Sequence, residues 1–436
     1  MTNELSNFAA RLREIILSEG RVPRGSDSEL RTPNSELRNR DGGSYNSPLR
    51  DFISLALELF ALQFKYNAAY RKICEARGFT PKVIEHWTQI PAVPTATFKE
   101  LELTCLAPTE RTAVFHSSGT VEQKPSRHFH NAESLAVYEA SLWSWFQANV
   151  AIGAPSTVSA NFQAGIVRAD SEIGAPLAKQ FQFVILTPPP LLAPHSSLVH
   201  MFETVRQKLG GTESAYFGKI ATDGSWTLDF DALLGMLNSS LATRHSSLVL
   251  GTAFSFVHLL DFLAERNLRF DLPAGSRVME TGGYKNRSRS MPKTELHQLI
   301  TERLGVPPSH IICEYGMSEL SSQAYDGVVG RAGSPLHAER RGGDTAPYLR
   351  VFQFPPWARV QVVSPETGRE VANGETGLIR VFDLANVFSV MAVQTEDLGI
   401  RRGEGFELIG RAALAEPRGC SLMSQSAIRN PQSAIP

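Results

Sequence analysis

The chain has 436 residues, of which 42% are hydrophobic, and a formal net charge of −1 at pH 7. A chain of this length can bury one large hydrophobic core or two smaller ones. The nearly neutral charge gives no general attraction to polyanions, so we expect no nucleic-acid partner. No apolar run reaches the roughly 18 residues of a membrane span, and charged residues interrupt the first 16 positions, so we expect a cytoplasmic protein.

Both ends of the sequence carry short polar repeats. Ser-Glu-Leu-Arg occurs twice within residues 28–40, and Gln-Ser-Ala-Ile occurs twice within residues 425–436. Each unit offers one strong apolar residue, and proline interrupts the repeats, which argues against a coiled coil. We therefore predict a partly disordered N-terminal segment over residues 1–46 and a repeat-bearing tail over residues 423–436. The organised chain is expected to run from about residue 47 to about residue 422.

The first half of this organised part has a mixed α/β pattern. Helical spacing of apolar residues begins at Phe52 and continues to Tyr66. Further on, short apolar runs occupy residues 247–252, 277–283 and 310–314, and a helical pattern follows the first of them. Such alternation indicates α/β layering, with functional loops where the strands end. We assign residues 47–340 to this α/β core.

The pattern changes from Trp357 onward. Alternating residues at 360–363 and 377–381 flank a turn sequence at residues 365–368. This is typical of a β-hairpin and predicts a β-rich subdomain over residues 341–422.

One candidate site is the hydroxyl- and glycine-rich loop in residues 116–125. Its backbone N–H groups and hydroxyls could converge on phosphate oxygens, and Lys124 or Arg127 could add positive charge. It is not a Walker A sequence, because no Gly-Lys-Ser/Thr ends it. An ordinary surface loop would have the same composition. Its central residues are Ser117, Ser118, Gly119 and Thr120.

A second candidate is the segment from Tyr315 to Glu319. The Glu319 carboxylate could hold Mg²⁺, which typically takes one or two protein carboxylates and completes its shell with phosphate and water. Ser318 could donate to a phosphate while Tyr315 packs against a base, and Gly316 lies between them. The alternative is a helix start capped by Ser318, with Tyr315 in the core.

A third candidate is the pair formed by Asp397 and Arg411. An aspartate at a strand end can accept hydrogen bonds from ribose hydroxyls, and the arginine could reach sugar or phosphate. A turn aspartate and a surface arginine would have the same sequence signature.

The order and spacing of these three motifs resemble the adenylate-forming superfamily of acyl-CoA synthetases and adenylation domains. Within it, the chain is most similar to the LuxE-type acyl-protein synthetases, with phenylacetate-CoA ligases as relatives. The resemblance covers about residues 90–422. It implies a large layered α/β adenylation domain with a β-rich subdomain.

The resemblance also implies a role for each matching residue. The serine-glycine loop corresponds to the phosphate loop, Tyr315 to an adenine-packing aromatic, and Glu319 to the magnesium ligand. The remaining implied nucleotide-binding residues are Gly282, Gly283, Ser318, Asp397 and Arg411. ATP and Mg²⁺ are the implied cofactors. The implied reaction joins a carboxylic acid, expected to be a fatty acid, to AMP and then transfers the acyl group to a protein thiol.

The short segment after Arg411 bears on the acyl acceptor. We expect the mobile C-terminal domain of acyl-CoA synthetases to be absent, and Cys420 resembles the acyl-accepting cysteine of LuxE-type enzymes. Arg418 could lower the pKa of the Cys420 thiol, although an unreactive cysteine is the alternative. An acyl-accepting reductase or carrier protein is the implied partner.

The phosphate loop also departs from the family pattern. The family usually continues with threonine and glycine, whereas this chain has Val121 and Glu122. Glu122 places negative charge near the expected triphosphate. Three hypotheses therefore remain open: an acyl-protein synthetase, an acyl- or aryl-CoA ligase of the phenylacetate type, and a non-catalytic nucleotide- or acyl-binding homologue.

Overall fold

The computed structural model describes residues 3–19, 52–117, 124–151, 181–212, 215–284, 288–327 and 350–412. The helices are α1 (Asn3–Glu19), α2 (Phe52–Tyr66), α3 (Ala68–Ala76), α4 (Thr97–Glu100), α5 (Ala132–Phe146), α8 (Ser197–Lys208), α9 (Phe230–Thr243), α10 (Ala253–Glu265) and α11 (Lys293–Leu304). Short 3₁₀ turns lie at Trp87–Gln89, Pro108–Glu110 and Pro308–His310, and a π-helical turn at Gln147–Ala151 extends α5.

The strands, in chain order, are β1 (Val93–Pro94), β2 (Ala113–His116), β3 (Arg127–His130), β4 (Phe181–Ile185), β5 (Gly218–Ile220), β6 (Trp226–Leu228), β7 (Ser246–Thr252), β8 (Arg277–Thr281), β9 (Ile311–Tyr315), β10 (Ala324–Gly327), β11 (Val351–Gln353), β12 (Ala358–Val363), β13 (Thr376–Asp383), β14 (Ala392–Arg402) and β15 (Gly405–Arg411). The predicted helix at 52–66 and the three apolar strands correspond to α2, β7, β8 and β9, so these predictions are confirmed.

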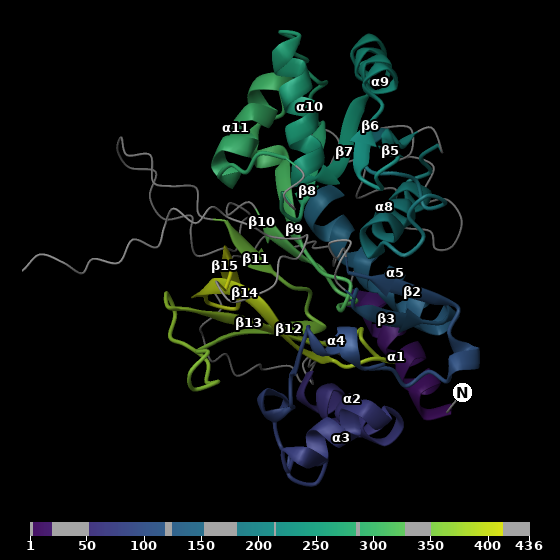
Figure 1. Ribbon diagram of the computed structural model, residues 1–436, viewed down its shortest axis with the longest axis vertical. Helices are drawn as coiled ribbons and strands as arrows, with labels where there is room; N and C mark the ends of the chain where they lie inside the picture. Colours follow the sequence, from purple (N-terminus) through teal and green to yellow (C-terminus); the bar gives the residue numbers. More distant parts are fainter. Residues whose placement is uncertain are drawn as a thin grey trace, which may run out of the picture.

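Most strands belong to one 11-stranded sheet that runs through the middle of the molecule (Figure 1). Its order is β12-β13-β14-β15-β11-β10-β9-β8-β7-β4, and β1 pairs with β14. Strands β4, β7, β8 and β9 are parallel to one another, whereas the strands from β10 to β12 pair antiparallel. The two small hairpins β2–β3 and β5–β6 lie outside this sheet.

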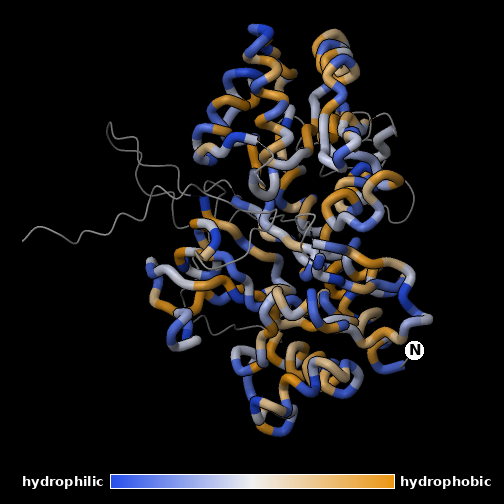
Figure 2. The backbone as a smooth tube through the Cα atoms, in the orientation of Figure 1, coloured by the Kyte–Doolittle hydropathy of each residue, from blue (hydrophilic) through white to orange (hydrophobic). Residues whose placement is uncertain are grey.

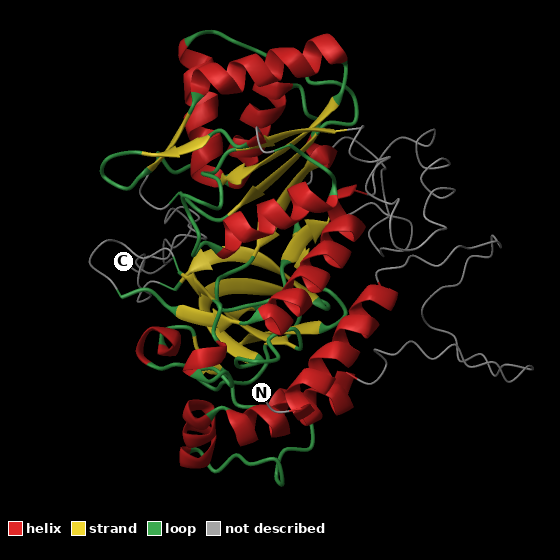
Figure 3. Cartoon of the chain, turned by 90° about the vertical axis from the view of Figure 1, so that its right-hand side faces the viewer, coloured by secondary structure: helices red, strands yellow, loops and turns green. Residues whose placement is uncertain are grey.

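Helices cover both faces of the parallel half of the sheet (Figure 3). On one face, Val249 of β7 and Val278 of β8 pack with α9, α10 and α11. On the other, Leu250 and Met279 pack with α5 and α8. Because both faces are buried, these strands read as continuous apolar runs rather than alternating ones. In Figure 2, where the backbone is coloured by hydropathy, hydrophobic segments lie mainly in the interior of the molecule and hydrophilic segments mainly at its periphery.

The predicted hairpin is present in the antiparallel half. Val360 of β12 pairs with Val381 of β13, and Val363 pairs with Leu378. Hydrogen bonding through β10, β11 and β15 joins this half to the parallel strands in the same sheet. The three predicted domain boundaries, after residues 46, 340 and 422, lie outside the described residues and stay predictions.

Helix α1 corrects the prediction that the organised chain begins near residue 47. Its apolar residues Leu5, Phe8, Leu12 and Ile16 recur at helical spacing and are each at most 2% exposed. The helix packs against α5 and α2. This amphipathic pattern lies upstream of the polar repeats in residues 28–40, on which the prediction was based. The repeats themselves, like the tail at 423–436, lie outside the described residues.

None of the helices in the described part of the chain combines the length and the hydropathy that crossing a membrane requires.

Candidate active site

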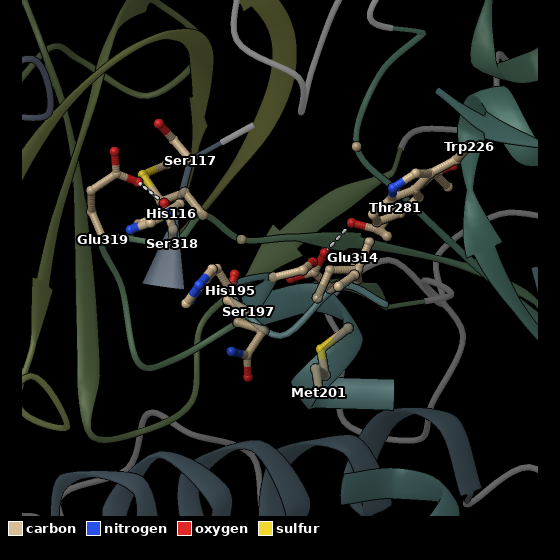
Figure 4. Close-up of a pocket in the computed structure, with 18 of the residues that line it drawn as sticks. His116, Ser117, His195, Ser197, Met201, Trp226, Thr281, Glu314, Ser318 and Glu319 are labelled. Atoms are coloured by element: carbon tan, nitrogen blue, oxygen red, sulfur yellow. Dashed lines mark hydrogen bonds between the residues drawn. The ribbon is translucent and has the colours of Figure 1, made fainter. Parts of the chain in front are cut away.

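A cavity of about 400 Å³ opens where the parallel strands end. Its lining includes Thr252 at the end of β7, Thr281 and Gly282 at the end of β8, and Glu314 and Gly316 at the end of β9. The carboxyl ends of parallel strands are where open α/β sheets bind ligands. The end of β2 and the start of α8 also line the cavity, and Figure 4 shows labelled residues of β2, α8, β8 and β9 around one space.

The cavity brings the first two sequence motifs into contact. Ser117 Oγ accepts a hydrogen bond of 2.9 Å from the backbone N–H of Ser126, and Ser126 Oγ lies 3.3 Å from Ser318 Oγ. His128 Nδ1 lies 2.8 Å from the carbonyl oxygen of Ser318; because a carbonyl oxygen can only accept, this nitrogen carries the proton. The β3 strand therefore fixes Ser318 beside Ser117.

Glu319 lies at the same end of the cavity, near Ser117 and Ser318 in Figure 4. Its side chain is 1% exposed, and Glu319 Oε2 accepts a hydrogen bond of 3.0 Å from Ser318 Oγ. Carboxylate and hydroxyl oxygens are hard donors that suit Mg²⁺. In the described part of the chain, no group of three or more His, Cys, Asp or Glu side chains is arranged so that it could hold a metal ion. Phosphate oxygens and water would therefore have to complete the shell of such an ion.

The third motif joins the second on the opposite side of β9. The Tyr315 hydroxyl donates a 2.9 Å hydrogen bond to Asp397 Oδ2, and Arg411 Nε lies 3.7 Å from Asp397 Oδ1. Asp397 and Arg411 are also directly paired residues of β14 and β15. Tyr315 is 3% exposed and packs edge-on against Phe406 at 5.2 Å. The motif is thus assembled, although these three residues do not line the cavity.

Two glycines shape the cavity. Gly282 has φ of +71°, a conformation that favours glycine, and lines the space. A Cβ atom on Gly316 would collide with Glu314 Oε1, so a larger residue there would displace that carboxyl group. Gly283 is buried next to Gly282 but does not line the cavity.

The remaining predicted site residues stay predictions. The Lys124 ammonium group lies 3.4 Å from Glu100 Oε2 of α4 on the surface and does not line the cavity. Ser118, Gly119, Thr120 and Cys420 lie outside the described residues, as do Val121 and Glu122.

Sequence reasoning missed Glu314. Its carboxyl is 5% exposed and lines the cavity, where the Thr281 hydroxyl donates a hydrogen bond to Glu314 Oε2. Burial raises the pKa of Glu314 to about 7, and the hydrogen bond from Thr281 opposes this rise. The signal was an acidic residue at the end of an otherwise apolar strand, residues 311–313.

Two histidines of the cavity wall were also missed. The rings of His116 and His195 lie 4.7 Å apart at an interplanar angle of 31°. Burial lowers the pKa of His116, and the neighbouring His195 and Arg127 add to the effect. His195 follows a proline-rich loop after β4, so no local motif marked it.

Comparison with known proteins agrees with this architecture. Residues 121–329 match the family described as "Acyl-protein synthetase, LuxE". This span contains the second motif but begins just after Thr120 and ends before Asp397. The chain is 23% identical over 380 residues to a long-chain-fatty-acid–luciferin-component ligase of Vibrio harveyi, covering 84% of this chain and 86% of the relative. A ligase of the same description from Aliivibrio fischeri is 22% identical over 46% of this chain and 51% of the relative.

Among solved structures, the chain resembles a 2-hydroxyisobutyryl-CoA ligase that was crystallised in its postadenylation state with an acyl-AMP. The TM-score is 0.51 at 14% identity, covering 82% of this chain. The chain spans 64% of that ligase's length. At this identity the likeness concerns the fold. The chain is thus similar to the acyl-protein synthetases of the LuxE family, and its fold resembles that of an adenylate-forming acyl-CoA ligase.

Proposed function

We propose that the chain uses ATP to activate a carboxylic acid as an acyl-adenylate and then transfers the acyl group to a protein thiol. The observation that carries this proposal is the meeting of Ser117, Ser318 and Glu319 at one end of a cavity that is lined elsewhere by several large apolar side chains. One end suits phosphate and Mg²⁺, and the rest suits an acyl group. The kinship with LuxE-type ligases supports the same reaction.

The reaction needs two anions held in line. A carboxylate oxygen of the acid attacks the α-phosphorus of ATP, the bond from that phosphorus to the bridging oxygen breaks, and pyrophosphate leaves. The hydroxyl of Ser117 can donate to a phosphate oxygen, the hydroxyl of Ser318 would do so by turning away from Glu319 Oε2, and Glu319 would hold Mg²⁺. The ion would supply positive charge that neutralises the departing pyrophosphate. Fixing both reactants within one cavity lowers the entropic part of the barrier.

The nucleoside is assigned to the cluster on the other side of β9. Asp397 would accept hydrogen bonds from the ribose hydroxyls, Arg411 places a positive charge beside that carboxylate, and Tyr315 would orient it. Backbone at Gly282 and Gly283, together with the loop of Ser118, Gly119 and Thr120, would approach the phosphates.

The acid is assigned to the apolar part of the cavity. Tyr138, Met201, Trp226 and Phe254 line it, and a fatty acid is the substrate class that the named relatives favour.

ATP–pyrophosphate exchange tests the proposal. The purified chain should exchange labelled pyrophosphate into ATP only when a carboxylic acid and Mg²⁺ are present. Glu319→Gln should reduce exchange by about 100-fold or more, since it removes the carboxylate charge that would hold the ion. Glu366→Gln, on the exposed turn after β12, is the matched control and should leave exchange unchanged. Exchange that Glu319→Gln leaves intact would contradict the role of Glu319.

The acyl acceptor is proposed to be Cys420, from which a reductase or carrier protein would take the acyl group. With a labelled acid and ATP, the chain should become labelled in a form that hydroxylamine releases. Cys420→Ser should abolish labelling while keeping pyrophosphate exchange. Normal labelling of this variant would remove Cys420 from the reaction, and release of AMP only with added coenzyme A would favour an acyl-CoA ligase instead.

A further inference from the structure

The acyl part of the cavity contains a buried polar site around Glu314. Side chains of successive strand residues point to opposite faces, so Tyr315 faces the aromatic cluster of Phe406 while Glu314 faces the cavity. Figure 4 shows Glu314 and Thr281 together, at a distance from Ser117 and Glu319. The two groups of polar residues therefore occupy different parts of one cavity.

Only one of the two oxygens of the Glu314 carboxyl accepts a hydrogen bond from the residues that the structure describes. Glu314 Oε2 accepts the hydrogen bond from Thr281 Oγ1. Within the described ranges, no residue donates a hydrogen bond to Glu314 Oε1, which lies beside Gly316 at the cavity wall. The missing side chain of Gly316 leaves this oxygen accessible to a ligand.

Gln323 adds a second acceptor. It also lines the cavity, is 5% exposed, and its side chain approaches the same face of Gly316, where a Cβ would lie 3.5 Å from Gln323 Cγ. Gln323 Oε1 is buried and accepts no hydrogen bond from the residues that the structure describes. The side chains of Glu314 and Gln323 thus both lie beside Gly316 and both line the cavity.

A plain aliphatic chain would cover both oxygens without pairing them. Buried polar groups left unpaired penalise binding strongly, whereas a ligand that supplies the missing donor gains both the hydrogen bond and selectivity. An acyl chain that covered these oxygens without pairing them would therefore bind less tightly than one that carries a donor.

We propose that the acid activated here carries a hydrogen-bond donor, a hydroxyl or an amino group, on its acyl chain, and that Glu314 with Gln323 binds this donor. The inference rests on the proposed function, because it assigns the acyl part of the same cavity. It adds a substrate class that kinship with fatty-acid ligases does not predict.

The ionisation of Glu314 is compatible with either donor. Burial raises the pKa of Glu314 to about 7, so an empty site holds comparable amounts of neutral and ionised carboxyl at neutral pH. A hydroxyl can donate to either form, whereas an ammonium group would favour the ionised form. The experiment must therefore compare both donors.

Chain-length-matched acids provide the test. Each unsubstituted fatty acid is compared with the same chain bearing a hydroxyl or an amino group at successive positions. Pyrophosphate exchange measures the reaction, and calorimetric titration in the absence of ATP measures binding alone. The wild-type chain should prefer one donor-bearing series by about tenfold or more in kcat/KM and in affinity. The series that is preferred identifies the donor.

Two variants of Glu314 then test whether this residue causes the preference for donor-bearing acids. Glu314→Leu should abolish it or reverse it in favour of the unsubstituted acid. Glu314→Gln should still bind an acid whose acyl chain carries a hydroxyl group. It should no longer bind an acid whose acyl chain carries an amino group, because a neutral amide cannot form an ion pair with ammonium. Glu366→Leu, an exposed glutamate outside the cavity, is the matched control and should leave the preference unchanged. Circular dichroism and thermal unfolding confirm that each variant is folded.

The outcomes separate the inference from the proposed function. Equal or better exchange with unsubstituted acids would overturn the inference while the proposed function stands. Selective calorimetric binding of a donor-bearing acid without any exchange would support the inference and contradict the proposed function. A preference that survives Glu314→Leu in a folded protein would overturn the role of Glu314.

Discussion

The Tyr315 hydroxyl donates a hydrogen bond of 2.9 Å to Asp397 Oδ2 and so helps to orient this carboxylate. Tyr315→Phe removes this donor and keeps the ring that packs against Phe406. We expect a loss of about 1 kcal/mol in the free energy of unfolding, the usual value of one hydrogen bond. If Asp397 binds ribose, the KM for ATP should rise about threefold to tenfold while kcat changes little. Urea unfolding and exchange kinetics measure the two effects, and an unchanged KM would argue against a ribose role for Asp397.

Glu314 makes stability depend on pH. Its folded pKa is about 7, raised by burial, whereas an exposed glutamate titrates near 4.5. The folded state therefore favours the neutral carboxyl, so this contribution is fully present below the unfolded pKa and is lost as pH rises through about 7. Lys293, which favours the ionised form, and Glu280, which opposes it, are the nearby charged groups that affect this value.

Glu314→Gln should remove this pH dependence. The free energy of unfolding of the variant, relative to wild type, should rise by up to about 3 kcal/mol between pH 4.5 and pH 8. Urea unfolding across this range measures the difference, in which the other titrating groups cancel. A constant difference would show that Glu314 titrates as an exposed carboxyl does.

Among the elements, α1 illustrates how an N-terminal helix completes the core. Phe8 is 1% exposed in the cluster that also contains Leu59 of α2 and Val137 of α5. Phe8→Ala should destabilise the protein by about 3–5 kcal/mol, because it removes buried ring surface and leaves a cavity. Glu14→Ala, on the exposed side of the same helix, should change stability by about 0.5 kcal/mol or less. Similar unfolding midpoints for the two variants would mean that α1 is not part of the cooperative core.

The elements also show what the sequence could predict. Strands β7, β8 and β9 were recognisable because burial on both faces demands continuous apolar runs. The hairpin β12–β13 was recognisable from alternation, although its connection spans residues 364–375 rather than a tight turn. Strand β11 has three residues and β1 has two, so neither contains enough of a pattern to be read. Joining the β-rich segment to the parallel strands in one sheet depends on these short elements.

The candidate site residues could likewise be predicted only where a recognisable sequence pattern contains them. Ser117, Ser318 and Glu319 belong to compact motifs, and the structure brings them together. Glu314 and Gln323 have no motif, since their importance lies in burial and in which face of a strand or loop they occupy. Periodicity could have placed Glu314 opposite Tyr315, but only the fold shows that a cavity lies there.

At the scale of the whole molecule, Asp383 connects the active-site loop to the antiparallel half of the sheet. It is fully buried at the end of β13. Asp383 Oδ2 accepts hydrogen bonds from the backbone N–H groups of Ser321 and Ser322 at 2.9 and 2.8 Å. Asp383 Oδ1 accepts from Ser322 Oγ at 2.7 Å and from the backbone N–H of Ala385 at 3.0 Å. The loop that follows Glu319 is therefore anchored by the Asp383 carboxylate, together with Asn386, whose side chain accepts from Ser321 Oγ and donates to the carbonyl oxygen of Glu319.

Asp383→Asn should loosen this connection, because the amide presents N–H donors in place of one oxygen, and each oxygen of the Asp383 carboxylate now accepts two hydrogen bonds. We expect a loss of about 2–4 kcal/mol in the free energy of unfolding, since buried donors are left unpaired. Pyrophosphate exchange, measured where the variant remains folded, should fall about tenfold or more in kcat because Glu319 is displaced. Asp231→Asn, at an exposed position of α9, is the control and should leave both quantities unchanged. Wild-type exchange in a destabilised Asp383→Asn protein would show that this anchor supports the fold without positioning Glu319, and the two halves of the sheet would then be coupled in stability alone.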